Sequence, residues 1–301
     1  TTIVFAMDNF LRICGIIRGS MALNILMSVV GALLEFILLG VVGVGVWGAA
    51  LSNCLAMMMS VLLALIPFWR KKTQLRFCRP KLKLRIVRQI VACGSPTFLN
   101  NIAGRITSIL LNAILVRLGG ETAVSVYGVL MYADGIVQPI MYGACDSLQP
   151  AVGYNWGAGR FSRVRAIEKC CFVAAFVISA AALVLMALFP SQVAGLFMAN
   201  ATPEAMQMAI WAMRLFVFTY LTRWFAFATQ SYMMAIEKPL QASLISVSTA
   251  LVFPVLLIVI LWPLGLTGIW LNFAGTSLLA AILALIIMIK MRPQLHRADL
   301  A

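Results

Sequence analysis

Residues 170–189, CCFVAAFVISAAALVLMALF, contain no charged side chain and lie between Lys169 and Pro190. A helix of about 20 apolar residues spans a hydrocarbon core of about 30 Å, so this stretch predicts a transmembrane helix. The whole chain has the same character, because 63% of its 301 residues are hydrophobic and 11% are charged. Soluble domains carry about 25% charged residues. Charge this sparse indicates a polytopic membrane protein and excludes a water-soluble domain.

Eight such stretches predict full membrane spans, which makes the fold class an all-α polytopic membrane protein. Residues 1–12 resemble the end of a further helix that is too short to span. Glycine and proline interrupt the apolar runs between the spans, as expected for turns between helices. The predicted spans are residues 20–39, 46–69, 90–116, 123–150, 170–189, 205–235, 240–261 and 266–289.

The basic residues indicate the orientation of the chain. The 23 Lys and Arg outnumber the 9 Asp and Glu, which gives a net charge of +14. If the spans alternate in direction, 19 of the 23 basic residues fall on one face, nine of them in residues 70–88. Basic loops stay on the cytoplasmic side. The charge therefore predicts cytoplasmic basic loops and a lipid bilayer as partner, and it argues against nucleic acid. Absence of a disulfide framework favours a bacterial inner (plasma) membrane.

Reactive and metal-binding side chains form no recognisable constellation. The seven cysteines make no CxxC pair, and His296 is the single histidine. No nucleophile stands near a base, and Gly157-Ala158-Gly159 lacks the context of a phosphate loop. The sequence thus predicts no enzyme, no metal site and no cofactor.

A weak internal repeat appears at an offset of 220 residues. Gly45-Val-Trp-Gly48 aligns with Gly265-Leu-Thr-Gly268, and Arg70 aligns with Lys290. Parallel repeats of this kind are typical of transporters. The repeat predicts one complete six-helix unit and about half of another, with roughly three and a half helices expected before Thr1. The expected divisions are residues 1–69 for the half unit, 70–89 for a basic loop, 90–290 for the complete unit and 291–301 for a tail.

Polar side chains follow one face of each of two neighbouring spans. Charged residues at membrane depth cost several kcal/mol, so they usually face a bundle interior or cavity. Arg105 and Asp134 lie equally far from the turn at Gly119-Gly120, which predicts an ion pair across this hairpin. Such a pair either locks the hairpin or forms a cavity wall that changes partners during transport. The predicted cavity residues are Asn101, Arg105, Asn112, Tyr127, Asp134, Gln138 and Tyr142, with Thr97 on the same face.

Asn24 and Glu35 share a face of span 20–39, and no basic residue lies within one turn of Glu35 on that helix. A carboxyl buried without a partner is protonated more readily, which suits a group that takes up and releases a coupling proton. The alternative is a neutral acid bonded to a neighbouring helix. Arg214 and Arg223 lie on opposite faces of span 205–235, and this pattern does not favour a site role for either.

Residues 148–160, LQPAVGYNWGAGR, resemble the hallmark loop of the multidrug and toxic compound extrusion (MATE) family. This motif is fairly specific. Gly94-Ser-Pro96, Asn9 to Gly15 and Gly45 to Ala50 match weaker family patterns, so the resemblance covers nearly the whole chain. The family residues of the loop are Gln149, Pro150, Gly153, Asn155, Gly157 and Gly159.

The resemblance implies two six-helix lobes around a cavity, here one complete lobe and half of the other. It implies an antiporter that exports amphipathic or cationic drugs in exchange for H⁺ or Na⁺. Glu35 would replace the acid of the family's fifth helix, while Gly31 replaces its asparagine. The family's seventh and tenth helices often carry acids, and here they carry arginines. The open alternatives are an organic-anion or lipid-linked oligosaccharide carrier, or a transport-inactive remnant. A monomer is expected.

Overall fold

The computed structural model describes residues 2–43, 45–70, 83–198 and 202–298. The basic segment 71–82 lies outside this description, as do the side chains of Thr2, Val46, Cys93, Pro96, Thr97 and residues 292–298. All regular structure within the described residues is helical, which confirms the predicted all-α class. The chain divides into two compact units, Thr1–Leu82 and Lys83–Ala301.

The first unit is a helical hairpin with one shorter helix against it. α1 (Thr2–Ile13) packs against α2 (Ile17–Glu35) and α3 (Val46–Trp69), and α2 continues into the π-helical turn η1 (Phe36–Val41). Helix α3 buries small side chains at every fourth position: Ser52, Ala56, Ser60 and Ala64. Small residues at this spacing let apolar helices approach closely where hydrophobic burial cannot drive their association.

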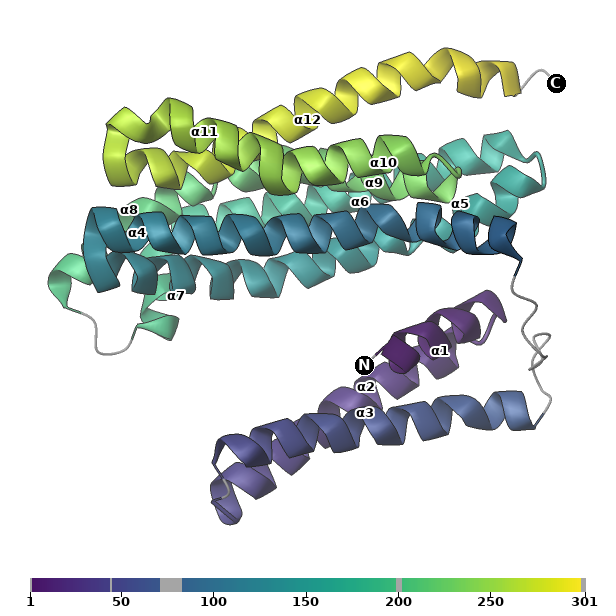
Figure 1. Ribbon diagram of the computed structural model, residues 1–301, viewed down its shortest axis with the longest axis horizontal. Coiled ribbons are helices and arrows are strands. Elements are labelled where there is room, and N and C mark those ends of the chain that lie inside the picture. Colours follow the sequence, from purple (N-terminus) through teal and green to yellow (C-terminus); the bar gives the residue numbers. More distant parts are fainter. Residues whose placement is uncertain (1, 44, 71–82, 199–201, 299–301) are drawn as a thin grey trace. The chain divides into compact units, whose positions relative to one another are not determined.

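The second unit begins with α4 (Leu84–Asp146), whose two arms meet at Gly120, a residue with φ 64° and ψ −157°. The arms fold back along each other there, as the glycine pair predicts (Figure 1). The following elements are α5 (Leu148–Gly157), α6 (Phe161–Leu188), α7 (Pro190–Phe197), α8 (Pro203–Phe216), α9 (Thr219–Ala235), α10 (Pro239–Val247), η2 (Ser248–Val252), α11 (Phe253–Leu261), η3 (Trp262–Leu264) and α12 (Gly265–Ala298).

Helix α9 is the centre of the second unit, because it packs against α4, α5, α6, α10 and α12. Its buried side chains are mostly small, among them Ala226, Ala228 and Ser231. The remaining core consists of apolar side chains from the surrounding helices, of which Trp270 and Met213 are almost fully buried. A central helix with small side chains brings its neighbours close enough to enclose a site.

Several predicted element boundaries are wrong. Residues 205–235, expected as one helix, form α8 and α9 with a break at Val217–Phe218. Residues 240–261 form α10 and α11 with the π-helical stretch η2 between them. The expected hallmark loop is helical through Gly157, and α12 continues through the expected tail to Ala298.

Within the described residues, five stretches are long and apolar enough to cross a membrane. Two of them, of 60 and 53 residues, are long enough for two crossings each. Large apolar side chains are exposed along these stretches, including Ile109 and Val259, as expected of surfaces that face lipid. The stretches are Ile17–Val41, Trp47–Trp69, Phe98–Gly157, Phe161–Leu188 and Pro239–Met291.

The glycines of the internal repeat have matching conformations. Gly45 and Gly265 precede or begin the last helix of each unit, with φ of 66° and 56°. Three residues later, Gly48 and Gly268 are buried against the preceding helix, at Leu38 and Leu261 respectively. Each unit therefore closes its final hairpin with a left-handed glycine and a close approach of two helices.

Candidate functional site

A cavity of about 580 Å³ lies within the second unit. Its lining comes from both arms of α4, from α8, α9, α10, η2 and α12, and from Pro254 at the start of α11. Cavities of roughly 300–1,000 Å³ accommodate drug-sized ligands. The charged residues among its lining are Arg105, Asp134 and Arg223. This cavity is the candidate site of the described chain.

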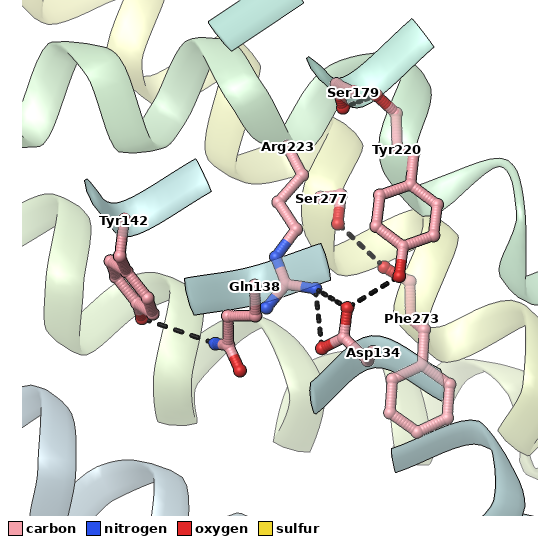
Figure 2. Close-up of polar contacts among 8 residues, drawn as sticks. All are labelled: Asp134, Gln138, Tyr142, Ser179, Tyr220, Arg223, Phe273 and Ser277. Carbon is pink, nitrogen blue, oxygen red and sulfur yellow. Dashed lines mark hydrogen bonds and ion pairs between the residues drawn. The ribbon is translucent and has the colours of Figure 1, made fainter. Parts of the chain in front are cut away.

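An ion pair between α4 and α9 dominates the chemistry of the cavity. The guanidinium of Arg223 donates from one nitrogen to both carboxylate oxygens of Asp134, at 2.9 and 3.0 Å. The Tyr220 hydroxyl donates to the same carboxylate at 2.7 Å. Figure 2 shows the carboxylate between these two donors. Both charged side chains are largely buried, with 8% of Asp134 and 16% of Arg223 exposed.

The predicted pair between Arg105 and Asp134 is therefore wrong. Counting from the turn places both residues at one depth, but a third helix, α9, supplies the partner of Asp134. Arg105 lines the cavity with an exposed side chain, and no acid among the described residues pairs with it. The two arginines thus differ, because one is neutralised and the other is free to meet a ligand.

The turn between α8 and α9 lies beside the cavity and precedes Arg223 on α9. Val217 and Phe218 interrupt the helix, and the flanking residues Phe216 and Thr219 both line the cavity. The Ser179 hydroxyl of α6 donates to the Tyr220 carbonyl just beyond the break. Irregular backbone at membrane depth is tolerated where it lines a cavity or is buried in protein.

Aromatic rings form much of the remaining wall. The guanidinium of Arg223 lies 5.4 Å from the centre of the Phe227 ring, which also meets Tyr142 edge-on at 4.4 Å. The Gln138 amide donates to the Tyr142 hydroxyl at 3.3 Å. Tyr127 stacks on Phe273 with ring centres 6.0 Å apart. The wall therefore combines apolar area with hydrogen-bonding groups, which suits an amphipathic ligand.

The structure brings together six of the seven predicted cavity residues: Asn101, Arg105, Tyr127, Asp134, Gln138 and Tyr142. Asn112 is not among the lining residues, because its amide donates to the Ser108 carbonyl of its own helix. Whether the six bind substrate stays a prediction. Sequence reasoning missed Tyr220 and Arg223, although the arginine's charge within an apolar span was itself a signal.

The coupling candidates Asn24 and Glu35 do not meet in the first unit. The Asn24 amide donates to the Asp8 carboxylate at 2.9 Å, and Ser20 donates to the same oxygen. Arg12 pairs with Asp8 at 2.7 Å. Glu35 is exposed at the end of α2, with no hydrogen bond or ion pair to any described residue. Asp8 was missed because it lies in the short segment expected to be a helix remnant.

The hallmark motif lies outside the cavity. The amide of Gln149 donates to Asp146, and that of Asn155 donates to the Ala151 carbonyl. Gly153 lies against α9, where a Cβ would come 3.5 Å from the Ala235 carbonyl oxygen. Gly159 adopts φ 68° in the turn that follows α5. Pro150 and Gly157 belong to α5. The motif therefore supports the packing of α5 and its turn, and none of its residues lines the cavity.

Across the described residues, no group of three or more His, Cys, Asp or Glu side chains could hold a metal ion. The charged chemistry of the second unit's cavity comes from one carboxylate and two guanidinium groups. This set suits recognition of a ligand by charge and hydrogen bonds.

Comparison with known proteins places the chain among transporters. It is 25% identical over 295 residues to the multidrug export protein MepA of Staphylococcus saprophyticus, covering 97% of this chain and 64% of that protein. It is 23% identical over 297 residues to MepA of Staphylococcus aureus (strain MW2), with the same coverage. The chain therefore spans slightly less than two thirds of the length of these relatives.

Two solved structures share the fold. A crystal structure of MATE in complex with MaL6 has a TM-score of 0.83 and 21% identity, over 94% of this chain and 64% of that one. The second is a MOP superfamily transporter from Pyrococcus furiosus, described as having a binding pocket of reverse polarity. It has a TM-score of 0.83 and 21% identity, over 93% of this chain and 63% of that one.

The apolar helices and the transporter relatives together identify a multi-pass membrane protein. The MatE family model matches residues 96–260, which are more than half of the chain. The motif at residues 148–160 lies inside this region, so the resemblance seen in the sequence is confirmed. This chain belongs to the MatE family of membrane transporters.

Proposed function

We propose that a protein containing this chain exports amphipathic small molecules as a secondary active antiporter. The observation that carries the proposal is the cavity of about 580 Å³, whose lining combines charged groups with aromatic rings inside a membrane-helix bundle. The relatives named as multidrug export proteins support it. Transport would proceed by alternating access of this cavity to the two sides of the membrane.

The coupling ion is proposed to be H⁺ or Na⁺, bound in the first unit. Glu35 remains the acid proposed to carry the coupling ion, because it has no partner among the described residues, but it is exposed at the end of α2, so the burial expected from the sequence is wrong. The carboxylate of Asp8, held by Asn24 and Arg12, is a second coupling candidate. Asp134 is less suited to the role, because Arg223 and Tyr220 already occupy its oxygens. No cofactor beyond this ion is proposed.

The proposal is tested by efflux from cells that express the protein. A fluorescent amphipathic dye should leave these cells faster than cells with an empty vector, and collapse of the ion gradients should abolish the difference. Glu35→Gln should remove the dependence on the gradient, while Glu204→Gln, an exposed acid at the start of α8, should leave it intact. Equal efflux with and without the protein would favour the transport-inactive alternative.

We also propose that the protein works as a monomer in a bacterial inner membrane, with the basic loops on the cytoplasmic side. This orientation is supported by two exposed basic residues, Arg160 just before α6 and Arg163 in the first turn of α6. A single cysteine introduced at Arg163, in a background free of other cysteines, should react with an impermeant maleimide in inverted vesicles. Labelling in intact cells instead would reverse the orientation.

An organic-anion carrier is a second candidate, and one observation favours it over export of cations. Asp134, the acid of the cavity lining, is neutralised by Arg223, whereas Arg105 has no acidic partner in the described chain. A lipid-linked oligosaccharide carrier stays an alternative, because the cavity is also lined by polar side chains such as Gln230, Asn272 and Thr276.

A further inference from the structure

Among the described residues of the second unit, the cavity lining has one positive charge without an acidic partner. Arg223 and Asp134 cancel each other at 2.9 Å, with Tyr220 completing the contacts of the carboxylate. The remaining charged lining residue is Arg105. The other acids described in this unit, Glu121, Asp146, Glu168, Glu204 and Glu237, are not lining residues.

Hydrogen-bond donors surround Arg105 on the same wall. Asn101 lies one turn before it and Ser108 lies one turn after it on the first arm of α4, and both line the cavity. Residues three and four apart on a helix share a face. The guanidinium therefore lies between two other polar lining residues of the same helix. A planar guanidinium binds carboxylate or sulfonate oxygens through two parallel N–H donors.

Apolar area lies in the same cavity as this charge. Tyr127, Phe216 and Phe273 line it, with Phe216 and Phe273 meeting edge-on at 5.3 Å. A ligand with an aromatic body and an anionic end would satisfy both parts of the lining. Such a ligand would also compensate the charge of Arg105.

We propose that this cavity binds amphipathic organic monoanions, with Arg105 as the residue that recognises the anionic group. The inference deepens the proposed function by naming its substrate class. Transport of the ligand rests on the proposed function, whereas binding of the ligand does not. A cationic ligand would have to draw Asp134 away from Arg223. That exchange would leave two arginines and one carboxylate facing a cation, an arrangement that disfavours binding.

Binding is tested with two probes that have the same aromatic body and opposite charge, naphthalene-2-sulfonate and 2-naphthyltrimethylammonium. The full chain, in nanodiscs of phosphatidylcholine, is titrated with each probe by calorimetry. We expect the sulfonate to bind at least tenfold more tightly than the cation. Arg105→Gln should weaken sulfonate binding by about tenfold or more, because hydrogen bonds between charged groups are among the strongest.

Two further variants separate recognition from structural effects. Arg105→Lys keeps the charge but lacks the two parallel donors, so its sulfonate affinity should fall between those of the unmodified chain and the Arg105→Gln variant. Arg214→Gln removes an exposed arginine of α8 that is not a lining residue, and it should change nothing. Tighter binding of the cation, or equal loss of sulfonate binding in the Arg105→Gln and Arg214→Gln variants, would overturn the proposal.

An anionic lipid headgroup offers the same chemistry as a soluble organic anion. Replacing a third of the phosphatidylcholine with phosphatidylglycerol distinguishes the two sources. Unchanged sulfonate affinity supports a soluble anion. Weaker sulfonate binding in the presence of phosphatidylglycerol would assign the site to lipid and overturn the substrate proposal. Failure of transport is a separate result: binding without gradient-driven efflux would contradict the proposed function and leave the anion site standing.

Discussion

Arg223→Met tests whether the ion pair of the cavity holds α4 to α9. The change keeps the length and apolar stem of the side chain and removes its charge. Asp134 then stays 8% exposed with Tyr220 as its remaining donor. Removing one partner of a buried pair costs about 3–5 kcal/mol, because the other charge stays buried without compensation. Since 16% of the Arg223 side chain is exposed, we expect about 3 kcal/mol.

A double-mutant cycle separates the pair from the effect of each residue. Asp134→Asn keeps an oxygen that can accept the Tyr220 hydroxyl, and it leaves Arg223 without a counter-charge. Combining it with Arg223→Met removes both charges and keeps that hydrogen bond. The double variant loses only the hydrogen bonds between positions 134 and 223, with no buried charge left over. Its free energy of unfolding should therefore fall by about 1 kcal/mol. The coupling energy between the two positions should be about 2 kcal/mol or more.

The assay is reversible SDS-induced unfolding of the full chain in mixed micelles, followed by tryptophan fluorescence. The matched control is Arg214→Met, at an exposed arginine, which should change the free energy of unfolding by about 0.5 kcal/mol or less. The reasoning is refuted if Arg223→Met costs no more than this control. It is also refuted if the double variant loses the sum of the two single losses.

Two further substitutions probe the helix contacts, and the same unfolding assay measures both. Gly268→Ala should cost about 1–3 kcal/mol, because its Cβ would clash with the Leu261 backbone, whereas Gly128→Ala meets open space and should be neutral or stabilising. The Thr107 hydroxyl donates to the Ala250 carbonyl, so Thr107→Val should cost about 1 kcal/mol. It should also speed hydrogen exchange in residues 248–252, and unchanged exchange would contradict this role.

The sequence predicts the helices well because lipid imposes their length and composition. Every backbone polar group must be satisfied within the hydrocarbon core, so apolar runs such as 170–189 have one stable form. The breaks are harder to predict. Val217 and Phe218 include neither glycine nor proline, and both keep right-handed helical φ and ψ, so the local sequence does not mark the interruption.

The wrong partner of Asp134 has the same origin. Distance from the Gly119-Gly120 turn determines depth, and both Arg105 and Asp134 do reach the cavity. The partner of Asp134 depends on how the helices pack. Counting along the two arms of this hairpin cannot determine that a third helix, α9, lies beside them. The opposite faces expected for Arg214 and Arg223 agree with the structure, because Arg214 is exposed outside the lining and Arg223 lines the cavity.

The irregular backbone of the second unit converges on the same cavity. Phe216 and Thr219 line it on either side of the helix break, and Thr249 and Ala250 line it from the π-helical stretch η2. A backbone carbonyl freed from the α-helical pattern is costly in hydrocarbon, so such segments persist where side chains or water can satisfy them. Thr107 does this for Ala250. The shape of the cavity therefore depends on the backbone of the α8–α9 turn and of η2 as well as on side chains.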